Sequence, residues 1–187
     1  MLCSKIKTPL SFLAIGISLI VIIVSCAELQ VLGRGRIKAL DNDARARLNA
    51  AMRDMRRRGI RPRINSAFRS HAEQRALYRC ARIRRCRARR GIYGAKRPGT
   101  SMHEAGLAVD IGGVATGRRR RLTAKGRQMV RIMRKHGFRW RYGLNDPAHF
   151  ELSPQLAGYR TEKAAIRAGQ RRWAPKSRAR RRASRRA

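Results

Sequence analysis

The chain has 187 residues, enough for one domain with a segment at each end rather than for several domains. Its 47 basic and 10 acidic residues give a formal net charge of +37, and most of the basic residues are arginine. Such a charge bears on the binding partners rather than on the fold. It favours a polyanion (teichoic acid, lipopolysaccharide, acidic lipid or nucleic acid), although a genomic bias towards arginine explains it equally well.

The N-terminal residues 1–27 are predicted to be a signal peptide or a membrane anchor, through which the protein would contact a membrane. Lys5 and Lys7 precede a run without charges over residues 8–27, and core helices seldom stay this apolar on every side. The end of the run resembles a bacterial lipoprotein cleavage site, which would leave Cys26 lipidated. The many basic residues after the run favour the opposite orientation, with the rest of the chain in the cytoplasm.

The first helix of the domain is expected to follow a linker over residues 28–39. Asp41 or Asp43 can cap this helix, in which apolar residues recur every three or four positions until Gly59 ends it. Residues 60–67 then have the composition and length of a strand.

A second helix is expected to begin at a capping box, in which Ser70 and Glu73 satisfy each other's backbone N–H groups. A basic loop over residues 81–100 is predicted to follow it. Cys80 and Cys86 could form a disulfide in an exported protein. Because positions six apart point to different sides of a helix, this bridge requires the helix to end near Cys80.

A third helix is expected between a cap at Thr123 and Gly137, and residues 138–142 have the pattern of a strand. With two further strands around the chemical motifs, these elements predict an α+β fold. A small antiparallel sheet would carry the site, with helices packed on it, in a domain over residues 40–160.

The C-terminal residues 161–187 are predicted to be a disordered tail rich in arginine. Basic and small residues dominate this segment, and they cannot bury a core. The tail could bind phosphate groups electrostatically.

Two short blocks, SMHEAGLAVD and DPAHFE, carry the chemistry. His103 and Asp110 lie seven positions apart in the first, and His149 follows Asp146 by three positions in the second. Two histidines and one carboxylate form a metal site, and three protein ligands leave the fourth position of a tetrahedral zinc open for water. This distinguishes a catalytic zinc from a closed structural one.

The second block also offers candidates for a general base. Asp146 stands on a loop shaped by Pro147, so it can approach the metal without ligating it. A carboxylate there can take a proton from the attacking water and pass it to a leaving amine. Glu151 would share a strand face with His149, which makes it either a reserve base or a residue that orients His149.

The bland alternative is that these histidines are ordinary polar or core residues, since short motifs also occur by chance. The chain has four histidines, and two of them fall in the two blocks. The other two, His71 and His136, are expected in the first turn of one helix and the last turn of another.

The blocks resemble the zinc D-Ala-D-Ala carboxypeptidase family. This family includes the vancomycin-resistance D,D-peptidases and the L-Ala-D-Glu endopeptidases of phage endolysins, and it shares its fold with the hedgehog signalling domain. Its pattern S-x-H-x(6)-D followed by E/D-x-x-H is matched by Ser101, His103, Asp110, Asp146 and His149. An upstream S-x-x-R-S with a following glutamine is matched by Ser66, Arg69, Ser70 and Gln74.

The resemblance, over roughly residues 40–160, implies roles for these residues. Zinc would be held by His103, Asp110 and His149, with Asp146 as the base. Arg69 and Ser101 would bind the substrate, because a planar guanidinium can hold a carboxylate bidentately or polarise a carbonyl. Gln74 would brace the site. Without the motif, Arg69 would be one of many solvated arginines.

The predicted function is therefore a zinc-dependent peptidase of peptidoglycan stem peptides in the cell envelope. The chain would be exported as a membrane-anchored, lipidated or secreted protein. A D-alanyl-D-alanine carboxypeptidase is favoured, but an aspartate base resembles the endolysin type of L-Ala-D-Glu endopeptidase. A non-catalytic basic envelope or virion protein is a third alternative, which the complete metal set disfavours. Removing residues 161–187 is expected to leave turnover of a small peptide nearly unchanged.

Overall fold

A computed structural model describes residues 36–90, 92, 94–115 and 121–174. All of them belong to one unit, Val31–Ala187. The predicted signal peptide or anchor, most of the predicted linker and residues 175–187 lie outside the described residues. No helix within the described ranges is both long and apolar enough to cross a membrane.

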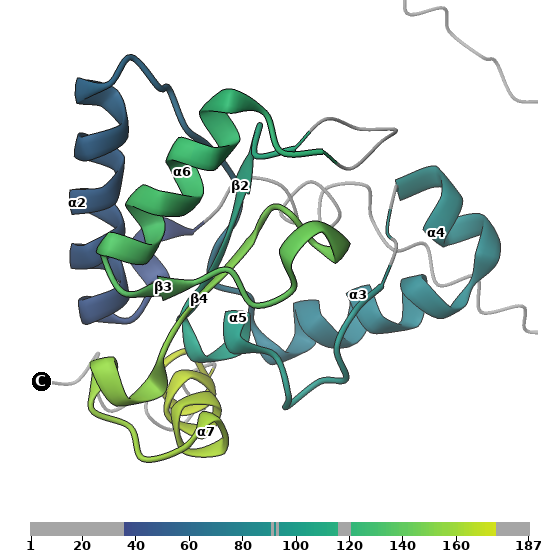
Figure 1. Ribbon diagram of the computed structural model, residues 1–187. Coiled ribbons are helices and arrows are strands. Elements are labelled where there is room, and N and C mark those ends of the chain that lie inside the picture. The colour runs from purple at the N-terminus through teal and green to yellow at the C-terminus, as the bar shows by residue number, and fades with distance from the viewer. Residues whose placement is uncertain (1–35, 91, 93, 116–120, 175–187) are drawn as a thin grey trace, which may run out of the picture. The chain divides into compact units, whose positions relative to one another are not determined.

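Four short antiparallel strands form one sheet in the order β1-β2-β4-β3, which confirms the predicted α+β class (Figure 1). They are β1 (Arg63–Ser66), β2 (Ala108–Gly112), β3 (Phe138–Arg139) and β4 (His149–Leu152). Asp110 in the middle of the sheet lies opposite Ser66 on one side and His149 on the other. Because paired residues share a face, these polar side chains gather on one face and Val109 and Phe150 on the other.

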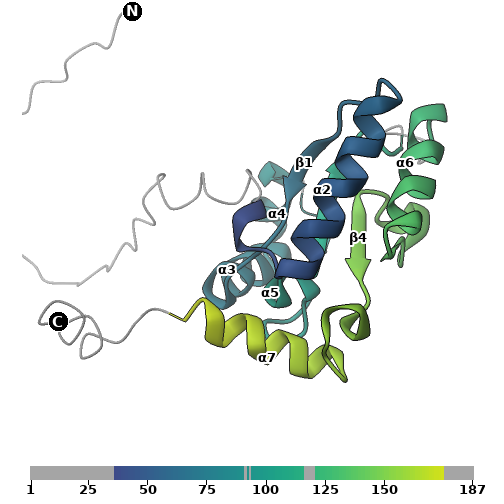
Figure 2. The ribbon, with the colours of Figure 1, turned by 90° about the vertical axis from the view of Figure 1, so that its left-hand side faces the viewer.

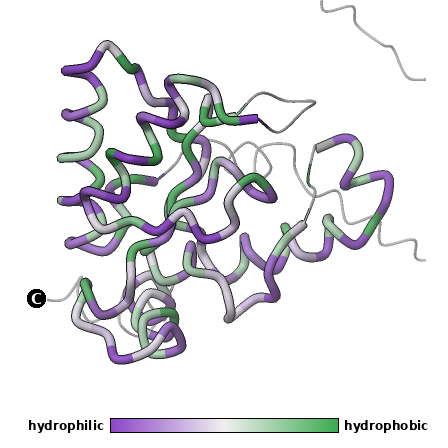
Figure 3. Tube along the Cα trace, in the orientation of Figure 1, coloured by the Kyte–Doolittle hydropathy of each residue, from purple (hydrophilic) through white to green (hydrophobic). Residues whose placement is uncertain are grey.

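Two amphipathic helices cover the apolar face. These are α2 (Asn42–Arg57) and α6 (Ala124–Lys135), which lie side by side in both views (Figures 1 and 2). Hydrophilic residues mark the outer edge of α2 (Figure 3). The inner faces and the sheet share one core, which includes Leu48, Met52, Met55, Val109, Ile111, Met129, Val130, Met133 and Phe150. The predicted caps are present, with Asp41 before α2 and Thr123 before α6.

The second helix, α3 (His71–Arg82), begins with the predicted capping box of Ser70 and Glu73. The prediction of a loop from residue 81 is wrong in its first half, since a further helix, α4 (Arg84–Arg90), follows a break at Ile83. Alanine and arginine are strong helix formers, which explains the extra helix. The predicted disulfide between Cys80 and Cys86 is present and joins the two helices across the break, with Cα atoms 5.3 Å apart.

The remaining elements are short. They are η2 (Ile37–Ala39), α5 (Met102–Ala105), η3 (Gly143–Asn145) and η4 (Pro154–Ala157). The strand predicted over residues 138–142 is shorter than expected, because only β3 pairs with β4. The chain then turns, and the Trp140 indole N–H donates to the carbonyl of Pro147 at 3.0 Å.

The prediction of a disordered tail is wrong for its first part. Residues Glu162–Arg172 form a helix, α7, capped by Thr161, which packs along α5. Its buried face consists of Ala165, Ile166 and Gly169. A Cβ at Gly169 would lie 2.1 Å from the carbonyl oxygen of Glu104, so only glycine permits this approach. The helix therefore adds Ala165 and Ile166 to the core and depends on close backbone packing at Gly169.

Asp41 joins the start of α2 to the C-terminal part of the domain. Its carboxylate accepts hydrogen bonds from the Asp43 backbone N–H at 3.1 Å and from the Tyr159 hydroxyl and Arg172 guanidinium at 2.9 Å each. Asp41 is buried, so these donors replace water around its charge.

We expect Asp41→Ala to lower the free energy of unfolding by about 2 kcal/mol or more, since it removes a helix cap and leaves buried donors unpaired. Denaturant unfolding measures this effect. Asp43→Ala is the matched control, because Asp43 is exposed and should change stability by less than about 0.5 kcal/mol. Equal losses in both variants would contradict the proposed role of Asp41.

Candidate metal centre

Three side chains from three elements converge at the polar face of the sheet. His103 comes from α5, Asp110 from β2 and His149 from β4, and one ligand atom of each lies within 4.8 Å of the others. Asp110 Oδ1 is 2.9 Å from His149 Nδ1 and 3.3 Å from His103 Nε2. Gly106, with φ of 75°, ends α5 and turns the chain into β2, which brings His103 over Asp110.

The second ring nitrogen of each histidine has its own partner. His103 Nδ1 donates to the carbonyl of Ala67 at 2.6 Å, and His149 Nε2 donates to Glu151 Oε1 at 2.9 Å. These bonds fix the tautomers, so that the other nitrogen of each ring faces Asp110. Two imidazoles and one carboxylate, both rings buried and held from behind, are a donor set that fits zinc.

The charges of the site are strongly coupled. Burial alone would raise the pKa of Asp110, but His103 and His149 outweigh it and hold this pKa well below its usual range. Burial lowers the pKa of His149, but hydrogen bonds to Asp110 and Glu151 reverse this effect and raise the pKa to about 9. At neutral pH the metal-free site therefore keeps a proton on His149, which a metal ion must displace.

Arg69 lies beside the three ligands. Its guanidinium donates to Gln74 Oε1 at 2.7 Å and to Ser66 Oγ at 3.0 Å, and it approaches Asp110 Oδ2 at 4.0 Å. Burial lowers the pKa of Arg69, an effect that the charge of Asp110 opposes. Gln74 is fully buried and also donates to the carbonyl of Lys96 at 2.7 Å. This geometry is the one expected of a bracing residue.

A cleft of about 130 Å³ opens over these groups and includes both Ser101 and Asp146 in its lining. Asp146 is an exposed residue, but its carboxyl group faces the cleft. Partial burial of this group raises its pKa. His149 opposes this shift, and the negative charge of Asp110 adds to it. A backbone hydrogen bond connects the loop that carries Asp146 to β4, because the His149 N–H donates to the Asp146 carbonyl at 3.1 Å.

Glu151 lies on the side of the His149 ring that faces away from Asp110, and its carboxylate has two hydrogen-bond partners. Besides His149 it accepts a hydrogen bond from Arg141 at 2.9 Å. Burial alone would raise the pKa of Glu151, but these two hydrogen bonds outweigh it and lower the pKa. The position favours a residue that orients His149 over a reserve base.

Two residues of the cleft did not emerge from the sequence. The ring of Tyr142 lies 5.2 Å from that of His149, and the Lys96 ammonium lies 5.5 Å from the Tyr142 ring centre. An aromatic residue shortly before the second block was the only available signal. His71 and His136 lie outside the ligand set, where they contact Glu104 and Asp54 at 2.8 and 2.7 Å.

The family model of D-alanyl-D-alanine carboxypeptidase, VanY, matches residues 37–154. The chain belongs to this family. The VanY match spans every candidate site residue and ends before α7. Membership supports the coarse assignment of the chain as a peptidase that acts on peptidoglycan.

Solved structures resemble the chain more distantly. A vancomycin-resistance D,D-pentapeptidase VanY variant, solved with Zn(II), is 22% identical, with a TM-score of 0.42 over 70% of this chain and 78% of the other. The LdcB LD-carboxypeptidase is 20% identical, with a TM-score of 0.44 over 71% and 64%. VanYB in complex with D-alanine-D-alanine is 21% identical, with a TM-score of 0.39 over 71% and 77%. No curated protein matches significantly.

We expect the metal-free protein to lose stability as the pH rises through about 9. Because the pKa of His149 is raised from 6.5 to about 9 in the folded state, its stabilising effect is complete below pH 6.5 and disappears above 9. The loss should reach a few kcal/mol in denaturant titrations with a chelator present. His149→Gln should flatten this dependence, and an unchanged slope in that variant would contradict it.

Proposed function

We propose that the protein is a zinc-dependent D-alanyl-D-alanine carboxypeptidase that trims peptidoglycan stem peptides. The observation that carries the proposal is the convergence of His103, Asp110 and His149 under a cleft that also contains Arg69 and Asp146. Bound zinc would supply Lewis acidity, polarising the scissile carbonyl and making a water acidic near neutral pH.

The residues of the chain would divide the remaining work. Arg69 would bind the free carboxylate at the end of the peptide, because its guanidinium is already oriented by Ser66 and Gln74. Ser101 lines the cleft and does not use its side chain to cap α5, so its hydroxyl is available to the substrate. Asp146 would take a proton from the attacking water and return it to the leaving amine, and its raised pKa suits both transfers.

The alternative activity is an L-Ala-D-Glu endopeptidase. It retains support because the base is an aspartate, as in the endolysin type, whereas Arg69 beside the metal ligands favours a substrate with a free carboxylate. A muropeptide digest read by mass separates the two activities. Release of D-alanine indicates the carboxypeptidase, and separation of the whole peptide after L-alanine indicates the endopeptidase.

Work on peptidoglycan requires export, and one structural feature agrees with it. The Cys80–Cys86 disulfide is typical of proteins that mature in an oxidising compartment. We therefore propose a location in the cell envelope, with the N-terminal segment as signal peptide or membrane anchor.

We expect Asp146→Ala to lower kcat by about 100-fold or more, because proton transfer contributes on this scale, while one zinc per chain is retained. Turnover of a synthetic stem peptide and metal analysis measure the two effects. Glu151→Gln is the comparison variant. It should weaken zinc binding by about 10–100-fold but regain turnover at saturating zinc. If Asp146→Ala keeps substantial turnover, the base is another group, with Glu151 the first candidate.

The α3–α4 arm, defined as residues 71–90, is a second feature of the proposal. We infer that it binds a polyanion of the envelope. It extends away from the sheet (Figure 1). Leu77 of α3 lines the cleft. Within the described residues no salt bridge engages its exposed arginines Arg75, Arg79, Arg84, Arg85, Arg87 and Arg89. The arm therefore presents unneutralised charge beside the proposed site.

We expect the combined change of Arg84, Arg85, Arg87 and Arg89 to glutamine to weaken binding to teichoic-acid-bearing walls and to flatten its salt dependence. With duplex DNA as a calibrating probe, each lost phosphate contact should reduce the log–log salt slope by about 0.9. The matched control changes four exposed arginines of α2 and α6, namely Arg53, Arg56, Arg131 and Arg134. If both variants lose the same binding affinity, the whole basic surface binds the polyanion and the arm has no special role. This is the result expected if the arginines reflect a genomic bias.

A further inference from the structure

We propose that α7 supports the candidate site from outside the cleft, with Glu104 and Gln170 as positioning residues for the segments that carry Ser101, His103 and Arg69. The inference rests on the proposed function for its catalytic readout, and metal affinity tests it separately. The VanY match ends at residue 154, so α7 lies beyond the part of the chain that the family model covers.

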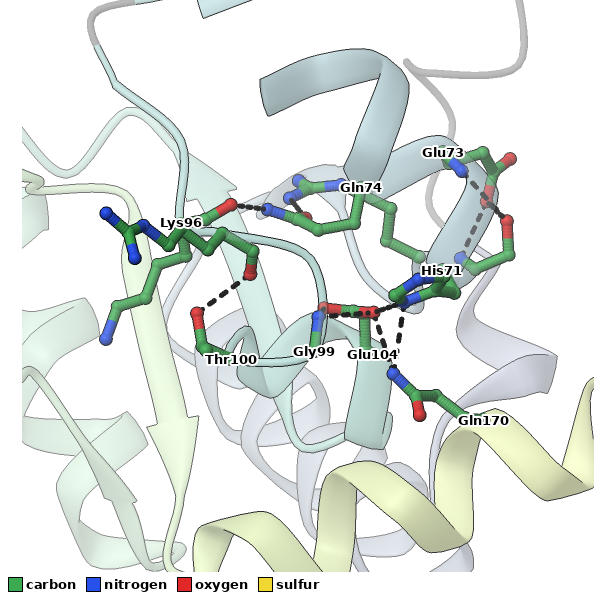
Figure 4. A network of polar contacts seen from close by, with 11 residues as sticks. His71, Glu73, Gln74, Lys96, Gly99, Thr100, Glu104 and Gln170 are labelled. Atoms are coloured by element: carbon green, nitrogen blue, oxygen red, sulfur yellow. Dashed lines mark hydrogen bonds and ion pairs between the residues drawn. The ribbon is translucent and has the colours of Figure 1, made fainter. Parts of the chain in front are cut away.

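The centre of this arrangement is the carboxylate of Glu104, which has no solvent exposure. It accepts the backbone N–H of Gly99 at 2.8 and 3.1 Å, lies 2.8 Å from His71 Nδ1 and accepts Gln170 Nε2 at 3.1 Å (Figure 4). A buried carboxylate is tolerated only with such partners. Gln170 is the contribution of α7, and it also lies 3.1 Å from His71 Nδ1.

Two of the partners, Gly99 and His71, connect Glu104 to segments that line the cleft. Gly99 stands in the loop between Lys96 and Ser101, both of which line the cleft. His71 opens α3, the helix whose Gln74 holds Arg69. Glu104 itself follows His103 directly in α5. One buried charge therefore ties the loop, the arginine-bearing segment and the histidine-bearing turn to α7.

Two further contacts hold α7 against the same segments. Gly169 lies so close to the Glu104 carbonyl that any side chain would collide with it. The Trp173 ring lies 5.4 Å from that of Phe68, the residue between Ala67 and Arg69. Ala67 accepts the hydrogen bond of His103, and the Arg69 N–H donates to the His103 carbonyl at 3.0 Å. The helix thus supports both sides of the junction between Arg69 and His103.

This geometry reverses an expectation from the sequence. A chain without residues 161–187 was expected to turn over a small peptide almost unchanged, because no ligand or base lies beyond His149. Loss of α7 would instead uncover Glu104 and free the cleft loop, so the truncated protein should bind zinc more weakly.

Point variants of the full chain test the inference through zinc affinity, measured by competition with a chelator. Removing a residue that directly orients a metal ligand typically weakens metal binding by about 10–100-fold. Glu104 does not contact a ligand side chain directly, so a smaller effect is expected. We therefore expect Gln170→Ala and Gly169→Ala each to weaken zinc binding by about 3–10-fold. Both should also lower kcat for a stem peptide more than they raise KM.

Two controls separate positioning from general stability. Arg171→Ala, at an exposed position of α7, should leave zinc affinity unchanged. Leu48→Ala destabilises the core between α2 and the sheet without touching Glu104, so it should lower Tm but not zinc affinity. Glu104→Gln, which keeps an acceptor for Gly99, should retain more zinc affinity than Glu104→Ala. If Glu104→Ala fails to fold, the α7 variants still decide the question.

The inference is overturned if Gln170→Ala and Gly169→Ala bind zinc as tightly as Leu48→Ala does at the same Tm. α7 would then contribute stability alone. If the variants weaken zinc binding while the wild-type protein cuts no stem peptide, the role of α7 is supported and the proposed function fails.

Discussion

The pairing of β2 with β4 determines where the site residues meet. Asp110 lies opposite His149, and Val109 lies opposite Phe150 on the other face. A shift of one residue would move His149 to the core face and Phe150 to the cleft. The apolar contacts that select the register therefore select the site geometry as well. Burial of Phe150 in the core shared with α2 and α6 therefore also fixes the position of His149 on the opposite face.

The two histidine ligands are oriented by hydrogen bonds of their second ring nitrogens, which form without a metal. A backbone carbonyl orients His103 and a carboxylate orients His149, so both rings are fixed by groups outside the set. Asp110, Asp146 and Glu151 lie close enough to repel one another. Arg69 offsets the charge of Asp110, and Arg141 offsets that of Glu151. The site is thus a mixed cluster of charges whose geometry depends on several elements of the fold.

The sequence predicted those parts of the fold that local patterns encode. The caps at Asp41, Ser70 and Thr123 could be predicted because side-chain and backbone partners lie within three residues. The metal ligands followed from spacing and a family pattern. The role of Glu104 could not be predicted, because two of its partners, His71 and Gln170, lie 33 and 66 positions away in the sequence. The same holds for α7, which buries only two apolar side chains, Ala165 and Ile166, and depends on the close approach of Gly169 to Glu104.

The disulfide of the arm links the maturation of the protein to its location. Cys80 and Cys86 join two helices at a break in the chain, and the first of these helices also forms part of the cleft wall. A chain in a reducing compartment would lack this cross-link between α3 and α4. With the proposed export, the cross-link beside the cleft would form only after the protein has left the compartment in which it is made.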